Sequence, residues 1–229
     1  MDLELSEVRI KLDQMSERIV SKLKDRSRYK HNKSVYLPDG IPIEGRSGIS
    51  FLEFALEDLQ NHFAKLGRYK YSDQHPLVSN TTLTTPVTRV APQSPITKVG
   101  IDIKKNVIEF YVNSIREFCE PGEDPSTYGE TVYCDSDLIH FLNERINLGR
   151  FAAEAKIKSD PSIREITNSE QLVKRIRRLE IEEKVVNDAI VIASRYGLDK
   201  PIVEKYFKWI IKETIEVEVA YLKQTNSRK

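Results

Sequence analysis

The chain has 229 residues, of which 39% are hydrophobic and 31% are charged, a composition typical of a globular protein with one sizeable core. Its 36 basic and 35 acidic residues are well mixed and leave a net charge of +1. No overall field therefore draws the chain onto nucleic acid or an anionic membrane, and any anion-binding site must be local.

The two cysteines lack metal-ligand spacing to the four histidines, which argues against a zinc site and against a disulfide framework. The N-terminal stretch MDLELSEVRI is acidic where a signal peptide needs basic and then apolar residues, and no apolar segment approaches membrane-spanning length. We expect one domain over residues 1–229, a cytoplasmic location, and no nucleic-acid partner, membrane association or metal.

The first half of the chain predicts two helices and a long connection. Apolar residues at spacings of three and four predict an amphipathic helix over residues 3–30. A second helix is predicted from Ser50, a suitable N-cap, to Leu66, with Gly67 as the C-terminal stop. Residues 72–97 hold four prolines and many Ser and Thr, which favours an extended connection or a flexible linker.

Helices also dominate the second half. We predict them over residues 99–118, 135–158, 168–195 and 201–225, separated by segments rich in Gly, Pro and Asp. Strand signals are scarce. The sequence therefore predicts an all-α fold.

Arg145 and Lys156 are 11 residues apart on a predicted helix, which corresponds to about three turns and about 16 Å along one face. Small residues between them leave room for a ligand. This face is suited to a small molecule that carries several negative charges, although a solvated face of ion pairs explains the same spacing.

Other polar residues border the predicted apolar faces. Thr214 and Glu218 are four residues apart within the apolar stripe of the last helix, where burial would raise the pKa of Glu218 and keep it protonated. Glu182 lies close to an inward face, and Arg9 lies at the margin of the first helix's core-facing side. Alternatively, Glu182 and Glu218 lie at the edges of these apolar faces and reach water. The side chain of Arg9 would likewise extend along the core so that its charged end is in water.

Five ordered segments resemble the all-helical chorismate mutases of fungi and plants, from about Glu7 to Tyr221. The segments are VRIKLDQMSERIVSKLKDRSRYKHNKSVY (8–36), GRYKYSDQHPLVS (67–79), YGETVYCDSDLIHFLNERINLGRFAAEAKIKSD (128–160), IEEKVV (181–186) and TIEVEVAYL (214–222). The resemblance implies a helical bundle that catalyses the pericyclic rearrangement of chorismate to prephenate, in phenylalanine and tyrosine biosynthesis, without a cofactor.

The resemblance also implies roles for individual residues. Arg9 and Arg145 would hold the two substrate carboxylates, because planar guanidinium groups suit that geometry. Lys156 would donate to the breaking ether oxygen, with help from a protonated Glu218.

Three more positions border the implied substrate. Glu182 would accept a hydrogen bond from the ring hydroxyl, and Thr214 would bind near a carboxylate. Arg178 stands four residues before Glu182, where the fungal enzymes have an asparagine. It would either strengthen dianion binding or pair with Glu182 and alter substrate choice.

Family members often form a homodimer with a tyrosine and tryptophan effector site at the interface. The match here is partial: Arg68 and Gly129 are present, but Gly67 replaces the first arginine of a fungal pair and Glu130 replaces a serine. Two further functions remain open: a catalytically silent helical interaction protein, and an enzyme that acts on isochorismate or an amino analogue.

Overall fold

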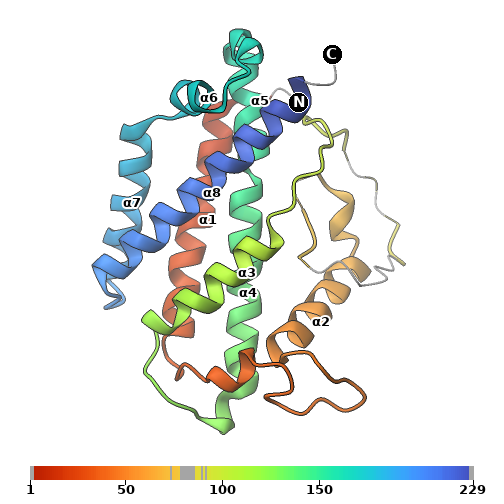
Figure 1. The fold of residues 1–229 in the computed structure, drawn as a ribbon, viewed down its shortest axis with the longest axis vertical. Helices are drawn as coiled ribbons and strands as arrows, with labels where there is room; N and C mark the ends of the chain where they lie inside the picture. The colour runs from red at the N-terminus through yellow and green to blue at the C-terminus, as the bar shows by residue number, and fades with distance from the viewer. Residues whose placement is uncertain (1–2, 73, 78–85, 89, 91, 227–229) are drawn as a thin grey trace.

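The computed structural model describes residues 3–72, 74–77, 86–88, 90 and 92–226, and helices form its regular structure (Figure 1). The α-helices are α1 (Leu5–Arg26), α2 (Phe51–Lys65), α3 (Lys104–Ser114), α4 (Tyr128–Asn147), α5 (Gly149–Ser159), α6 (Ser169–Ile176), α7 (Leu179–Ser194) and α8 (Lys200–Asn226). Five 3-10 turns join them: η1 (Lys33–Tyr36), η2 (Arg68–Lys70), η3 (Ile115–Glu117), η4 (Pro125–Thr127) and η5 (Pro161–Glu165). The predicted all-α class is confirmed for the described part of the chain.

Helices α1 and α4 lie side by side, and α5 continues the column of α4 (Figure 1). Helix α8 crosses this layer and contacts α4, α5 and α7, while α7 also contacts α1. Helices α2 and α3 pack on α4. Five helices, α1, α4, α5, α7 and α8, therefore meet in the half of the molecule that holds the candidate site.

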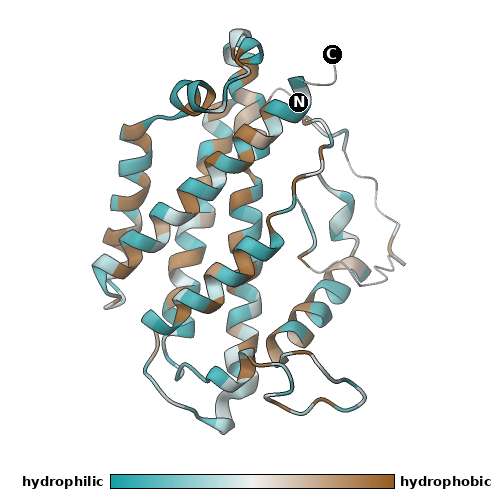
Figure 2. Ribbon diagram, viewed as in Figure 1, coloured by the Kyte–Doolittle hydropathy of each residue, from teal (hydrophilic) through white to brown (hydrophobic). Residues whose placement is uncertain are grey.

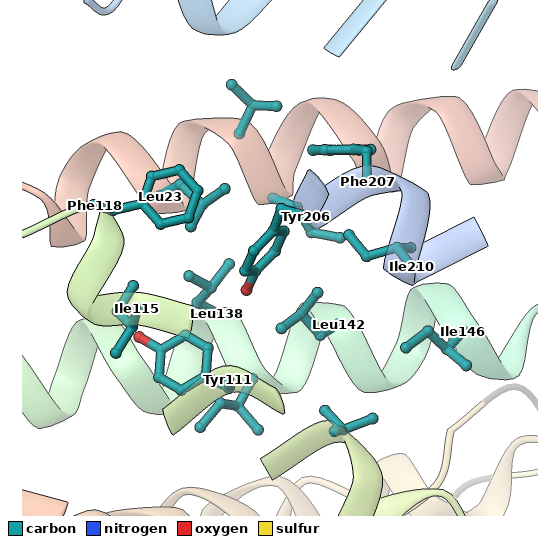
Figure 3. Packing of buried hydrophobic residues seen from close by; sticks show 14 of the residues in the cluster. Leu23, Tyr111, Ile115, Phe118, Leu138, Leu142, Ile146, Tyr206, Phe207 and Ile210 are labelled. Carbon is teal, nitrogen blue, oxygen red and sulfur yellow. The ribbon is translucent and has the colours of Figure 1, made fainter. Parts of the chain in front are cut away.

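The main core lies between α1, α3, α4 and α8, where Figure 3 shows Leu23, Tyr111, Leu138, Leu142 and Phe207 converging. Each of these side chains is fully buried. Along the long helices hydrophobic residues alternate with hydrophilic ones (Figure 2), as expected for helices with one buried face. Burial of one such side chain stabilises the fold by about 1.5–3 kcal/mol.

The ends of α2 agree with the sequence. Ser50 Oγ accepts from the backbone N–H of Glu53, and a Glu53 carboxylate oxygen accepts from the backbone N–H of Ser50 at 2.7 Å. This capping box pairs two N–H groups that the helix itself leaves free. Gly67 follows with φ 77°, a left-handed conformation that glycine adopts without steric cost.

Other predicted boundaries are wrong. Helix α1 ends at Arg26 rather than near residue 30, and α3 begins at Lys104 rather than at 99. In the predicted connection over 72–97, the described residues form no helix or strand, and residues 73, 78–85, 89 and 91 lie outside the described part.

Helix α4 begins at Tyr128 and not at Asp135, because Asp135 is a fully buried acceptor rather than an N-cap. Arg26 Nε donates to its Oδ1 at 2.6 Å, and the Tyr36 hydroxyl donates to its Oδ2 at 2.8 Å. Tyr111 donates a further hydrogen bond. Burial raises the pKa of Asp135, and Arg26 opposes this shift by favouring the charged carboxylate. The pair fixes the end of α1 to the middle of α4.

The helix predicted over 135–158 is divided between α4 and α5 at Leu148. Beyond the division, α8 approaches so closely that a Cβ on Gly149 would lie 2.7 Å from the carbonyl oxygen of Thr214. The glycine therefore permits the contact that brings Thr214 and Glu218 towards α4 and α5.

The helix predicted over 168–195 is divided between α6 and α7 at Arg177 and Arg178, whose backbones leave the helical region at ψ 148° and 88°. The buried residue Ile176 of α6 and the buried Val186 of α7 are ten residues apart. On one continuous helix their directions would differ by about 80°. The turn lets both helices bury their apolar faces.

Candidate active site

A cavity of about 270 Å³ lies between α1, α4, α5, α7 and α8. Its volume is close to the lower end of the range of small-molecule pockets, roughly 300–1,000 Å³. All seven residues predicted to act on the substrate line it: Arg9, Arg145, Lys156, Arg178, Glu182, Thr214 and Glu218. They come from four helices of the bundle, from α5 and from the α6–α7 turn, so only the tertiary fold brings them together.

Arg145 is the most deeply placed cation of the set, with 3% of its surface exposed. Its Nε donates to Ser16 Oγ and one terminal nitrogen donates to Thr214 Oγ1, each at 3.3 Å. Burial lowers the pKa of Arg145 to about 10, which still leaves it cationic at neutral pH. Among the described residues no carboxylate forms an ion pair with it, so its charge is available to an anionic ligand.

Lys156 on α5 forms an ion pair with Glu218 on α8, with 2.5 Å between Nζ and Oε2. Glu218 is 5% exposed, and burial raises its pKa, while the nearby Lys156 and Arg145 oppose the shift. Thr214 lies one turn before Glu218, and its hydroxyl donates to the carbonyl of Ile210 while accepting from Arg145. The burial expected for both α8 residues is present.

Glu182 pairs with Arg177, a residue that the sequence did not single out. Arg177 Nε donates to both carboxylate oxygens, at 3.0 and 3.2 Å, and a terminal nitrogen donates at 2.5 Å. Arg178 instead donates to the backbone carbonyls of Arg175 and Arg177. Of the two roles considered for Arg178, pairing with Glu182 is therefore wrong for this structure.

Two other charged residues at the cavity were also missed by sequence analysis, Asp13 on α1 and Lys184 on α7. Asp13 lies one helical turn after Arg9, so the two side chains share one face of α1. This spacing is the feature of the sequence that could have indicated Asp13 as a cavity residue. The cavity is thus lined by six basic and three acidic side chains. This excess of positive charge suits a dianion.

The three residues predicted for an effector site lie apart within the chain. Arg68 pairs with Glu144 near the C-terminal end of α4, has a terminal nitrogen 3.3 Å from His140 Nε2, and lies 4.5 Å above the ring of Phe63. Gly129 and Glu130 are exposed at the opposite end of α4. Fifteen residues of helix, about 22 Å, separate Glu144 from Gly129.

Comparison with known proteins gives consistent results. The family model described as "Chorismate mutase type II" matches residues 127–219. The chorismate mutase of Schizosaccharomyces pombe is 27% identical over 245 residues, covering 96% of this chain and 95% of that protein. The crystal structure of Aro7p chorismate mutase from Candida albicans, in complex with L-Trp, superposes with a TM-score of 0.89 at 28% identity, covering 98% of this chain and 95% of that one.

The chain belongs to the chorismate mutase family of the fungal and plant type. The structure of AtCM1 with tyrosine bound in an allosteric site is also similar, with a TM-score of 0.87, 25% identity and coverage of 97% and 96% of the two chains. The family resemblance predicted from the five segments is confirmed. Within the described residues, none of the helices combines the length and apolar composition that crossing a bilayer requires.

Proposed function

We propose that this chorismate mutase family member converts chorismate to prephenate in the 270 Å³ cavity, as a step towards phenylalanine and tyrosine. The observation that carries the proposal is the convergence of the predicted site residues on one cavity with an excess of positive charge. The reaction is intramolecular, so the protein needs no nucleophile. It must fold the substrate into a compact conformer and stabilise the charge that develops on the ether oxygen.

The cavity residues divide this work. Arg9 and Arg145 hold the two carboxylates, with Thr214 beside Arg145, and Arg178 adds positive charge at the α6–α7 turn. Preorganised cations in a cavity that excludes water stabilise developing charge more strongly than water does, because they need no reorganisation during the reaction.

Lys156 and Glu218 act at the ether oxygen. Lys156 Nζ donates to Glu218 Oε2 at 2.5 Å, and both side chains line the cavity, so the two groups can act on the same substrate atom. A protonated Glu218 can donate to the ether oxygen, whereas an ionised carboxylate would repel the developing negative charge.

The proposed activity is tested by following the loss of the chorismate diene absorbance with purified protein and identifying the product. Prephenate should form with the wild type and not with a Lys156→Ala preparation purified in the same way. Prephenate also distinguishes this activity from turnover of isochorismate or an amino analogue. No turnover of chorismate between mildly acidic and neutral pH would refute the proposal and favour a silent binding protein.

Activity should decrease as pH rises through the pKa of Glu218. Burial raises that pKa, so the protonated donor persists above the usual range of a glutamic acid and is lost at higher pH. Glu218→Gln keeps a donor that does not titrate in this range and should flatten the decrease. The measurement is kcat/KM against pH for both proteins, and identical profiles would contradict the role of Glu218.

A homodimer with an effector site between its subunits is also part of the proposal. Arg68 of one copy and the Gly129–Glu130 segment of a second copy can meet across an interface, whereas one chain holds them at opposite ends of α4. Tyrosine and tryptophan are the proposed effectors, since the neighbours described above contain them. The cytoplasmic location stays a prediction, because the plant relatives include proteins named chloroplastic.

Tyrosine should change the rate of the wild type and leave Arg68→Ala unaffected, because an effector carboxylate needs the guanidinium that now pairs with Glu144. Light scattering should give twice the chain mass of 26.5 kDa. A monomeric protein would contradict this part of the proposal. So would a wild type whose rate and melting temperature do not change when tyrosine is added.

A further inference from the structure

The ion pair of Arg177 and Glu182 lies between two cavities. Both residues line the candidate active site, and both line a larger groove of about 710 Å³ between α7 and α8. Ile211 and Ile215 form the rest of the shared wall. The Glu182 side chain thus has two spaces into which its carboxylate can turn.

Without a partner, Glu182 would face charges of both signs in each space. The groove contains three lysines and the carboxylates Glu183, Glu204 and Glu216. The active-site side contains several cations and also Glu218, a carboxylate close enough for its charge and that of Glu182 to repel. Glutamate has three rotatable bonds, so its position is not fixed by its backbone alone. Arg177 fixes the orientation of the Glu182 carboxylate by binding its two oxygens with a planar fork.

The geometry depends on the turn between α6 and α7. Five residues on one continuous helix would place Arg177 and Glu182 about 140° apart around the axis, too far to pair. Because the chain leaves the helix at Arg177 and Arg178, the Arg177 side chain returns over the first turn of α7. The side chain of Glu182 is 17% exposed and that of Arg177 is 42% exposed, so the partner lies on the outer side of the carboxylate.

We propose that Arg177 is a positioning residue, which holds the Glu182 carboxylate in the orientation that accepts the hydrogen bond of the substrate's ring hydroxyl. The inference rests on the proposed function, since it concerns the same cavity and substrate. The two neighbouring arginines then have separate roles. Arg177 orients the Glu182 carboxylate, whereas Arg178, which replaces the fungal asparagine, remains available to the substrate.

A double-mutant cycle of Arg177→Gln and Glu182→Gln tests the inference. Arg177→Gln should lower kcat/KM about 10-fold, mostly through kcat, because the carboxylate must be oriented in the transition state. In the Glu182→Gln background the same change should alter kcat/KM by less than about 2-fold. The melting temperature of Arg177→Gln should stay within about 2 °C of the wild type, since the pair is partly exposed.

Arg175→Gln is the matched control, because it removes the same charge two residues away and breaks an exposed pair with Asp160. Its kcat/KM should equal that of the wild type. Equal effects of Arg177→Gln in both backgrounds, or an effect confined to KM, would overturn the inference and assign Arg177 to direct substrate binding. A wild type that forms no prephenate would overturn the proposed function as well, whereas turnover without coupling overturns this inference alone.

Discussion

Arg145→Met should reduce kcat/KM for chorismate about 1,000-fold, a loss of about 4 kcal/mol of transition-state stabilisation. Arg145 is the buried cation of the cavity, and its protein partners are the hydroxyls of Ser16 and Thr214. Asp13 and Glu218 act on Arg145 electrostatically without forming an ion pair with it, so a substrate carboxylate would supply the direct ionic partner. Methionine has a similar length and no charge, so the substitution removes the ionic contact with little change in packing.

The same substitution should leave the free energy of unfolding unchanged within about 1 kcal/mol or raise it, because a desolvated cation without an ionic partner costs stability. The combination of lost activity and retained stability separates a functional arginine from a structural one. Urea unfolding and steady-state kinetics on one preparation measure both.

Arg150→Met is the matched control for Arg145→Met. Arg150 lies five residues further along, is also buried, and donates to the carbonyl of Ile101 at 2.7 Å, but it does not line the cavity. This variant also removes a buried charge without an ionic partner, so its free energy of unfolding should stay within about 1 kcal/mol of the wild type or rise, and it should keep its kcat. A destabilised Arg145→Met protein with near-normal kcat/KM would show that Arg145 serves the fold and not the substrate.

Arg26→Ala should lower the free energy of unfolding by about 3–5 kcal/mol, because it leaves the charge of Asp135 buried without its partner. Both side chains have 0% exposure. Arg26 also donates to the carbonyls of Tyr29, Lys30 and His31, which follow the end of α1. The melting temperature should fall by about 10 °C for a chain of this size.

Two further variants identify the cause of this loss. Arg175→Ala breaks an exposed Arg–Asp pair and should cost less than about 1 kcal/mol. Arg26→Ala combined with Asp135→Asn should be less unstable than the sum of the two single variants, since the double change removes both charges. Strict additivity would show that lost packing, and not the unpaired carboxylate, explains the effect.

The sequence by itself determined the all-α class, the ends of α2 and the polar residues that line the cavity. Periodic apolar residues and the capping residues act over one or two turns, which is why α2 begins after Ser50 and ends before Gly67 as predicted. The sequence predicts that Arg145 and Lys156 share one face. Both line the cavity, although Arg145 lies on α4 and Lys156 on α5. These features depend on residues that are close together in the chain.

Only the tertiary structure decided which partner each polar side chain meets. Asp135 has the residue type of an N-cap, but the docking of α1 and α3 makes it a buried acceptor for Arg26. Arg177 pairs with Glu182 because packing of α6 and α7 divides a predicted helix. Periodicity reports which face of a helix is apolar, but the element that covers this face, and hence the desolvation and charge around each group, is set by contacts between distant segments.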